Sequence, residues 1–98
     1  MNNQQIVNEI VMYIQNNGNN FLNWYVGIAS DPRIRLFNDH CVQEKGGCWI
    51  FRSSLSSEDA RIIENYIIDK YHTKGDIGGG SENSNFVYAY KITESTKQ

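Results

Sequence analysis

The sequence predicts an α/β (α+β) domain in which a small three-stranded antiparallel sheet is packed by helices, in the order α-β-α-β-α-β. Apolar residues recur at helical spacing in two segments. Three other short segments are rich in aromatic and β-branched residues and are bounded by turn residues. Because 98 residues suffice for one modest hydrophobic core, the whole chain, 1–98, is expected to form a single domain.

The first half of the chain predicts a helix, a strand and a second helix. Residues 4–15 carry an apolar face with helical periodicity, and an Asn- and Gly-rich run ends that helix. A strand is expected over 21–29. Asp31-Pro32 then begins a helix that extends to about residue 39, since proline is favoured at the first helical position.

The second half predicts a strand, a long helix and a last strand. Lys45-Gly46-Gly47 turns the chain into a strand over 48–52. Ser56 and Asp59 form a capping box before a helix that ends near Lys74-Gly75. A flexible, turn-rich loop is expected over 75–81, and the alternation over 86–92 predicts the third strand.

Charge and hydrophobicity restrict the partners. The net charge of −2 provides no overall attraction to nucleic acid, so phosphate contacts would have to come from local cations such as Arg33, Arg52 and Lys74. No apolar run approaches the roughly 20 residues that span a bilayer, and the first residues carry no basic leader. We therefore expect a soluble, cytoplasmic chain without membrane contact.

The cysteines are expected to be free thiols, because two are too few for a disulfide framework. A zinc site built from His40, Cys41, Cys48 and His72 is the less favoured alternative, because the chain has no C-x-x-C pair. A phosphate-binding role for Gly78-Gly79-Gly80 is also less favoured, since the run lacks the lysine and serine of a P-loop.

The segment Tyr25-Val26-Gly27 is followed, across the turn at Asp31-Pro32, by Arg35. This arrangement resembles the GIY-YIG nuclease superfamily, which includes the N-terminal domain of the excinuclease C subunit. In that family a Tyr-Ile/Val-Gly strand precedes a helix that carries an arginine. Glu64, within the segment 59–68, lies in the register of the family's metal-binding glutamate.

The resemblance implies a catalytic set of Tyr25, Arg35, His40, Glu64 and Tyr13. In this set Tyr25 lies near the attacking water, Arg35 stabilises charge on the scissile phosphate, and Glu64 holds Mg²⁺ or Mn²⁺. Arg35 and Glu64 are expected to be exposed cleft residues. Taken singly, each residue also has a structural explanation, such as a surface pair between Arg35 and Asp39.

The chain departs from the family pattern in three places. The family's first Gly-Ile-Tyr strand is not evident. Val11-Met12-Tyr13 is the nearest candidate for it, although the helical periodicity favours a helix there. His40 follows Arg35 by five positions, whereas the family spacing is four. The late asparagine of the family is not in register, and Asp76, Asn83 and Asn85 are only positional candidates.

Two functions remain open, beside a third possibility in which the two motif matches are chance and the chain is an interaction protein with no ancestral site. The first is a metal-dependent endonuclease that hydrolyses phosphodiester bonds in DNA. The second is a catalytically degenerate module of the same fold that binds nucleic acid or a protein partner. A Tyr13 side chain beside Tyr25 would favour the enzyme, and a Tyr13 within a helix would favour the binding module. Base stacking on partly exposed aromatic residues of the strands is a secondary idea, with four candidates: Trp24, Trp49, Tyr88 and Tyr90.

Overall fold

The computed structural model describes residues 1–75 and 82–98. Three strands form one antiparallel sheet in the order β1-β3-β2, so the predicted α+β class with a three-stranded antiparallel sheet is confirmed. The elements follow one another as α1 (Asn3–Asn16), η1 (Phe21–Asn23), β1 (Trp24–Ala29), η2 (Ile34–Asp39), β2 (Trp49–Ser53), α2 (Ser57–Tyr71) and β3 (Phe86–Lys91). Here η1 is a single 3-10 turn and η2 is a π-helix.

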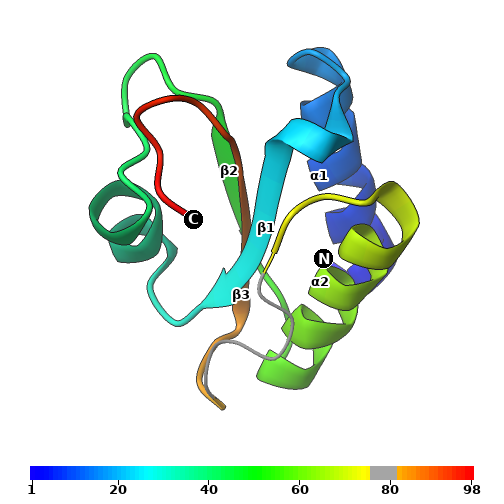
Figure 1. The fold of residues 1–98 in the computed structure, drawn as a ribbon. Coiled ribbons are helices and arrows are strands. Elements are labelled where there is room, and N and C mark those ends of the chain that lie inside the picture. The colour runs from blue at the N-terminus through cyan, green and yellow to red at the C-terminus, as the bar shows by residue number, and fades with distance from the viewer. Residues whose placement is uncertain (76–81) are drawn as a thin grey trace.

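The sheet lies between two layers (Figure 1). Helices α1 and α2 cover one face, and η2 and the C-terminal segment lie on the other. In β1, Trp24 and Val26 point towards the helices, whereas Tyr25 points towards η2. All residues of β1 are therefore buried, although a strand of a one-sided antiparallel sheet would alternate between core and solvent.

Both long helices begin at polar caps that the sequence contains. The side chain of Asn2 accepts a hydrogen bond from the Gln5 backbone N–H at 2.8 Å, and Gln5 bonds back to the Asn2 backbone. Ser56 caps α2 as predicted, since its hydroxyl accepts from the Asp59 N–H at 3.1 Å. The Asp59 carboxylate accepts a hydrogen bond from the Ser56 hydroxyl at 3.1 Å, whereas in a full capping box it would accept from the Ser56 backbone N–H.

The free edge of β1 is covered by the residues that follow α2. The Val26 N–H donates to the Lys74 carbonyl at 2.9 Å, and the Lys74 N–H donates to the Trp24 carbonyl at 2.8 Å. Lys74 therefore lies beside Tyr25 along an edge that would otherwise present unpaired backbone groups. No helix among the described residues is long and apolar enough to cross a membrane.

Candidate functional site

Gly27 makes room for a tyrosine of the neighbouring strand. Gly27 pairs with Tyr88 of β3, and a Cβ on Gly27 would lie 2.5 Å from the Tyr88 hydroxyl. The Tyr88 ring therefore lies across the glycine, on the same face as Tyr25. The two rings are stacked with their centroids 6.4 Å apart.

Tyr88 is thus a second tyrosine beside Tyr25, on the strand hydrogen-bonded to it. From the sequence, Tyr88 is a candidate only for base stacking, because β3 is far from β1 in the chain. The available signal was the alternation over 86–92, which places Tyr88 and Tyr90 on one face. Which strand would pair with β1 could not be read from that alternation.

Arg35 and His40 are brought to the same side by the π-helix η2. The His40 N–H donates to the Arg35 carbonyl at 2.9 Å, five residues earlier, where an α-helix would bond four residues earlier. Residues five apart in η2 are therefore joined by a backbone hydrogen bond, as residues four apart are in an α-helix. The extra residue between Arg35 and His40 is absorbed in this wide turn, and both side chains act on Tyr88.

His40 is 3% exposed and is held at both ring nitrogens. Its Nδ1 lies 2.7 Å from the Lys97 carbonyl oxygen, and its Nε2 lies 2.7 Å from the Tyr88 hydroxyl. A carbonyl can only accept, so the Lys97 oxygen pairs with an Nδ1 that carries a proton, whereas the Tyr88 hydroxyl can either donate to Nε2 or accept from it. The Tyr25 ring packs on the imidazole, with 4.7 Å between centroids.

The environment keeps this cluster uncharged apart from Arg35. Burial lowers the pKa of His40, and the charge of Arg35 lowers it further, against the opposing effects of Lys97 and Asp39. Burial raises the pKa of Tyr88 to about 12, although Arg35 opposes this. Burial also raises the pKa of Tyr90. At neutral pH both phenols therefore keep their protons and His40 is a neutral imidazole.

The lowered pKa of His40 predicts that acid destabilises the fold. Below about pH 6.5 the unfolded chain protonates His40 while the folded chain resists protonation, so the free energy of unfolding falls as pH decreases towards the folded-state pKa. Urea titrations between pH 7.5 and 5 should show this fall. His40→Asn should reduce the slope, whereas His72→Asn, at an exposed position, should retain it. Equal slopes in all three proteins would contradict the assignment.

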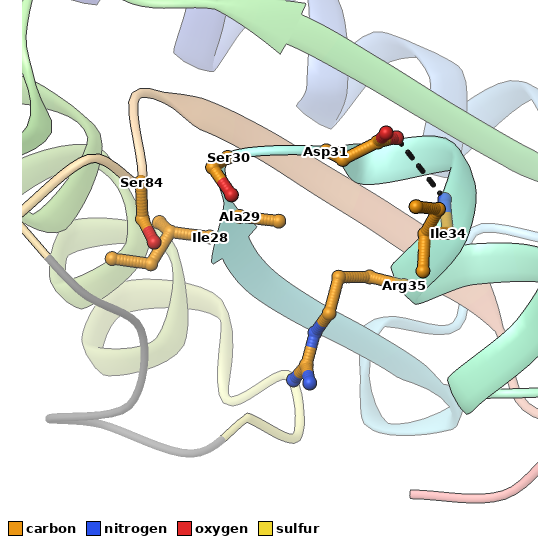
Figure 2. A pocket seen from close by; sticks show the side chains of 7 residues that line it. All are labelled: Ile28, Ala29, Ser30, Asp31, Ile34, Arg35 and Ser84. Atoms are coloured by element: carbon orange, nitrogen blue, oxygen red, sulfur yellow. Dashed lines mark hydrogen bonds between the residues drawn. The ribbon is translucent and has the colours of Figure 1, made fainter.

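Arg35 stands at the wall of a pocket of about 320 Å³ at the end of β1 (Figure 2). Its guanidinium projects in front of β1, while the Asp31 carboxylate turns back to accept from the Ile34 N–H at 3.2 Å. The Arg35 side chain is 44% exposed and forms an ion pair of 3.2 Å with Asp39. Burial opposes its charge, but Tyr88, Asp39 and Tyr25 outweigh this and raise its pKa. Arg35 is therefore a cation that solvent can reach at the mouth of a buried cluster.

Glu64 lies close enough to this cluster to act on it. It is on α2, and its charge contributes to the raised pKa of Tyr88. The prediction that Glu64 is an exposed cleft residue is wrong, because it is 1% exposed. Its position follows from the apolar face of α2, where it lies among Ala60, Ile63 and Ile67.

Tyr13 is not brought to Tyr25. It lies within α1, on the helical side of the sheet, where its ring meets Trp24 edge-on at 5.8 Å. Its hydroxyl accepts from the Trp49 N–H at 3.1 Å. The helical periodicity of this segment is thus confirmed, and Tyr13 has a packing role on the face opposite the cluster.

The candidate nucleic-acid contacts do not form one cluster. Arg33 lies over the Phe37, Trp49 and Phe51 rings at 5.5–6.0 Å and pairs with Glu44 at 3.5 Å. Arg52 pairs with Glu9 of α1 at 2.6 Å, on the other side of the sheet. Of the four aromatic residues considered for base stacking, three are fully buried and only Trp49 is partly exposed.

Cys41 and Cys48 are free thiols, as expected. Within 1–75 and 82–98, no three His, Cys, Asp or Glu side chains are grouped so as to hold a metal ion by themselves. The glycine run at 78–80, Asp76 and most of the predicted loop lie outside the described residues. Comparisons of the chain with protein-family models, with curated proteins and with solved structures found no match.

Proposed function

We propose that the chain is a divergent GIY-YIG-like domain that hydrolyses phosphodiester bonds in DNA with the help of Mg²⁺ or Mn²⁺. The observation that carries the proposal is the convergence of Tyr25, Arg35, His40 and Tyr88 on one face of β1 and β3. These are the residue types of the family's site. Arg35 is at a pocket that could admit a phosphate group.

Two apparent departures from the family pattern become compatible with it. The π-turn of η2 compensates the longer spacing between Arg35 and His40. Strand β3 would supply, as Tyr88, the tyrosine that the family takes from its first strand. The strand paired with β1 then still carries a tyrosine, although it follows β1 in the chain instead of preceding it. The domain would then be a rearranged version of the family topology in which this strand comes last.

Each residue has a distinct part in such a site. The Arg35 guanidinium offers a fork of donors that matches two oxygens of a phosphate. Neutral His40 can accept a hydrogen bond from the Tyr88 hydroxyl through Nε2, and transfer of that proton would give a tyrosinate and an imidazolium, a pair with no net charge. The Tyr25 ring packs against both partners and fixes their orientation.

Glu64 is the residue that would hold the cation. Mg²⁺ is commonly bound through one or two carboxylates, while water and substrate phosphates complete its shell. A single carboxylate whose charge acts on Tyr88 fits this mode, and it does not fit a closed cage made by protein alone. When bound, the ion would supply positive charge to the scissile phosphate.

The binding module is the second candidate, and burial favours it. Tyr25, His40 and Tyr88 are 7%, 3% and 0% exposed, so Arg35 alone among these four is open to a ligand. Tyr13 within α1 favours the same alternative. Such a module would use the surface around Arg35 to bind nucleic acid or a protein without cleaving it.

A titration of the ¹⁵N-labelled protein with Mn²⁺ tests the proposal. We expect paramagnetic broadening centred on Glu64, Arg35 and Tyr25, and its loss in Glu64→Gln, which keeps the shape of the side chain. Glu58→Gln, at an exposed position on the same helix, should retain the broadening. With Mg²⁺, the wild type and Glu58→Gln should cleave single-stranded and branched DNA, and Glu64→Gln should not.

The other outcomes are also informative. DNA-induced shifts around Arg35 without a response to metal and without cleavage would replace the enzyme with the binding module. Broadening that persists in Glu64→Gln would remove Glu64 from the metal site. No response to metal or DNA would contradict both functions.

A further inference from the structure

The residues after β3 turn the chain back onto His40. Thr93 and Thr96 close a tight turn: the Thr96 N–H donates to the Thr93 carbonyl at 3.3 Å, and the Thr93 N–H donates to the Thr96 hydroxyl at 3.0 Å. The C-terminal segment then runs back along the face of the sheet that carries η2 (Figure 1). We call residues 93–97 the C-terminal strap.

The strap meets His40 through backbone groups alone. The Lys97 N–H donates to the His40 carbonyl at 2.7 Å, and the Lys97 carbonyl accepts from His40 Nδ1 at 2.7 Å. The Tyr90 hydroxyl also donates to this carbonyl, at 3.1 Å, and lies 3.0 Å from Nδ1. One backbone unit therefore fixes both the main chain and the ring of a buried histidine.

The hydroxyl and carbonyl partners of the imidazole differ in what they can impose. A hydroxyl can donate or accept, so Tyr88 is compatible with either tautomer of His40. A carbonyl oxygen can only accept, so Lys97 requires the proton to be on Nδ1. We propose that the C-terminal strap is a positioning element: through the Lys97 carbonyl it fixes His40 as the Nδ1–H tautomer and so makes Nε2 the acceptor of the Tyr88 proton.

This assignment has a catalytic consequence that rests on the proposed function. In the opposite tautomer, Nε2 would donate to Tyr88 and could not take its proton. The charged and titratable groups that face His40 are Arg35 and Asp39 from η2, Tyr25 from β1, and Tyr88 and Tyr90 from β3. None of these can impose a tautomer as a backbone carbonyl does, because the phenols can reverse their roles and Arg35 and Asp39 act on His40 only through their charge.

Long-range ¹H–¹⁵N spectra of the histidine rings at pH 7.5 test the inference without any need for activity. The full chain should show His40 almost entirely as the Nδ1–H form, with a slowly exchanging ring proton, while exposed His72 serves as an internal reference. A chain ending at Thr96 should show mixed tautomers and fast exchange. Lys97→Ala should behave as the full chain, because only backbone groups of Lys97 are used.

Tyr88→Phe is the decisive companion, since it removes the hydroxyl partner of Nε2 and leaves the strap intact. It should retain the Nδ1–H form. An Nε2–H form in the full chain, a mixed population in Tyr88→Phe, or an unchanged tautomer in a folded chain ending at Thr96 would each overturn the proposal. If that shortened chain fails to fold, the full chain and Tyr88→Phe still decide between Lys97 and Tyr88.

If the protein cleaves DNA, shortening it should lower kcat about tenfold or more and leave KM nearly unchanged, as expected for a residue that acts through another. The tautomer and the rate are separate readouts. Loss of the Nδ1–H form in a protein that never cleaves would support the strap and contradict the nuclease. An intact rate with mixed tautomers would separate the strap from catalysis and overturn its catalytic consequence.

Discussion

Replacing Arg35 with alanine is expected to lower phosphodiester cleavage at least about 100-fold, the usual effect of removing one donor that stabilises developing charge. The guanidinium is 44% exposed at the pocket beside β1, where a phosphate could reach it. The free energy of unfolding should change by less than about 1 kcal/mol, since exposed ion pairs such as that with Asp39 contribute little. Single-turnover cleavage and urea unfolding measure the two effects.

Two further variants separate charge from geometry in this experiment. Arg35→Lys keeps the charge but loses the planar fork, so it should recover only part of the rate. Lys70→Ala removes an exposed cation from α2 and should cleave as the wild type does. An unchanged rate in Arg35→Ala would remove Arg35 from the mechanism. Unfolding of Arg35→Ala would reassign Arg35 to a structural role.

The substitution Gly27→Ala is expected to destabilise the fold by about 3 kcal/mol, at the upper end of the usual cost of overpacking. The new Cβ would lie 2.5 Å from the hydroxyl oxygen and 2.6 Å from Cζ of Tyr88. The Tyr88 ring cannot easily move away, because it is fully buried and its hydroxyl is bonded to His40. Urea unfolding followed by tryptophan fluorescence gives the change.

A double-mutant cycle with Tyr88→Phe shows whether this contact is the cause. Removing the hydroxyl relieves the shortest contact but leaves the one to Cζ, so the double mutant should be less destabilised than the sum of the single changes by about 1 kcal/mol. Additive effects, or a Gly27→Ala protein within 1 kcal/mol of wild type, would show that the strand can shift instead. The glycine of the Tyr-Val-Gly segment would then lack this packing role.

The secondary structure was largely predictable, because it depends on local patterns. The apolar periodicity predicted α1 nearly to its ends, and Ser56 marked the start of α2. The predicted end of α2 near Lys74-Gly75 is wrong, because His72 takes a left-handed conformation that ends the helix at Tyr71. The predicted strand over 21–29 begins only at Trp24, since Phe21–Asn23 form a 3-10 turn. The segment after Asp31-Pro32 was predicted as an α-helix, but over Ile34–Asp39 it is a π-helix, which has one residue more in each hydrogen-bonded turn.

The candidate site was only partly predictable. Tyr25, Arg35 and His40 were found because they lie close together in the chain. Tyr88 and Lys97 were missed, because they reach His40 from more than 45 residues away through the pairing of β1 with β3 and the return of the strap. Tyr13 was a candidate because it lies twelve residues before Tyr25 in the sequence. Since Tyr13 lies in α1 rather than on a strand paired with β1, this separation does not bring it beside Tyr25.

The sequence by itself determined the α+β class, the number of strands, the helix starts and the short segment that carries Tyr25 and Arg35, since each follows from periodicity or from residue preferences within one element. The tertiary structure alone decided the order β1-β3-β2, the ring of Tyr88 across Gly27, the contact of the Lys97 carbonyl with His40 and the burial of Glu64. These features depend on contacts between residues far apart in the chain. Such contacts are selected by how well whole elements pack, and no local pattern encodes that.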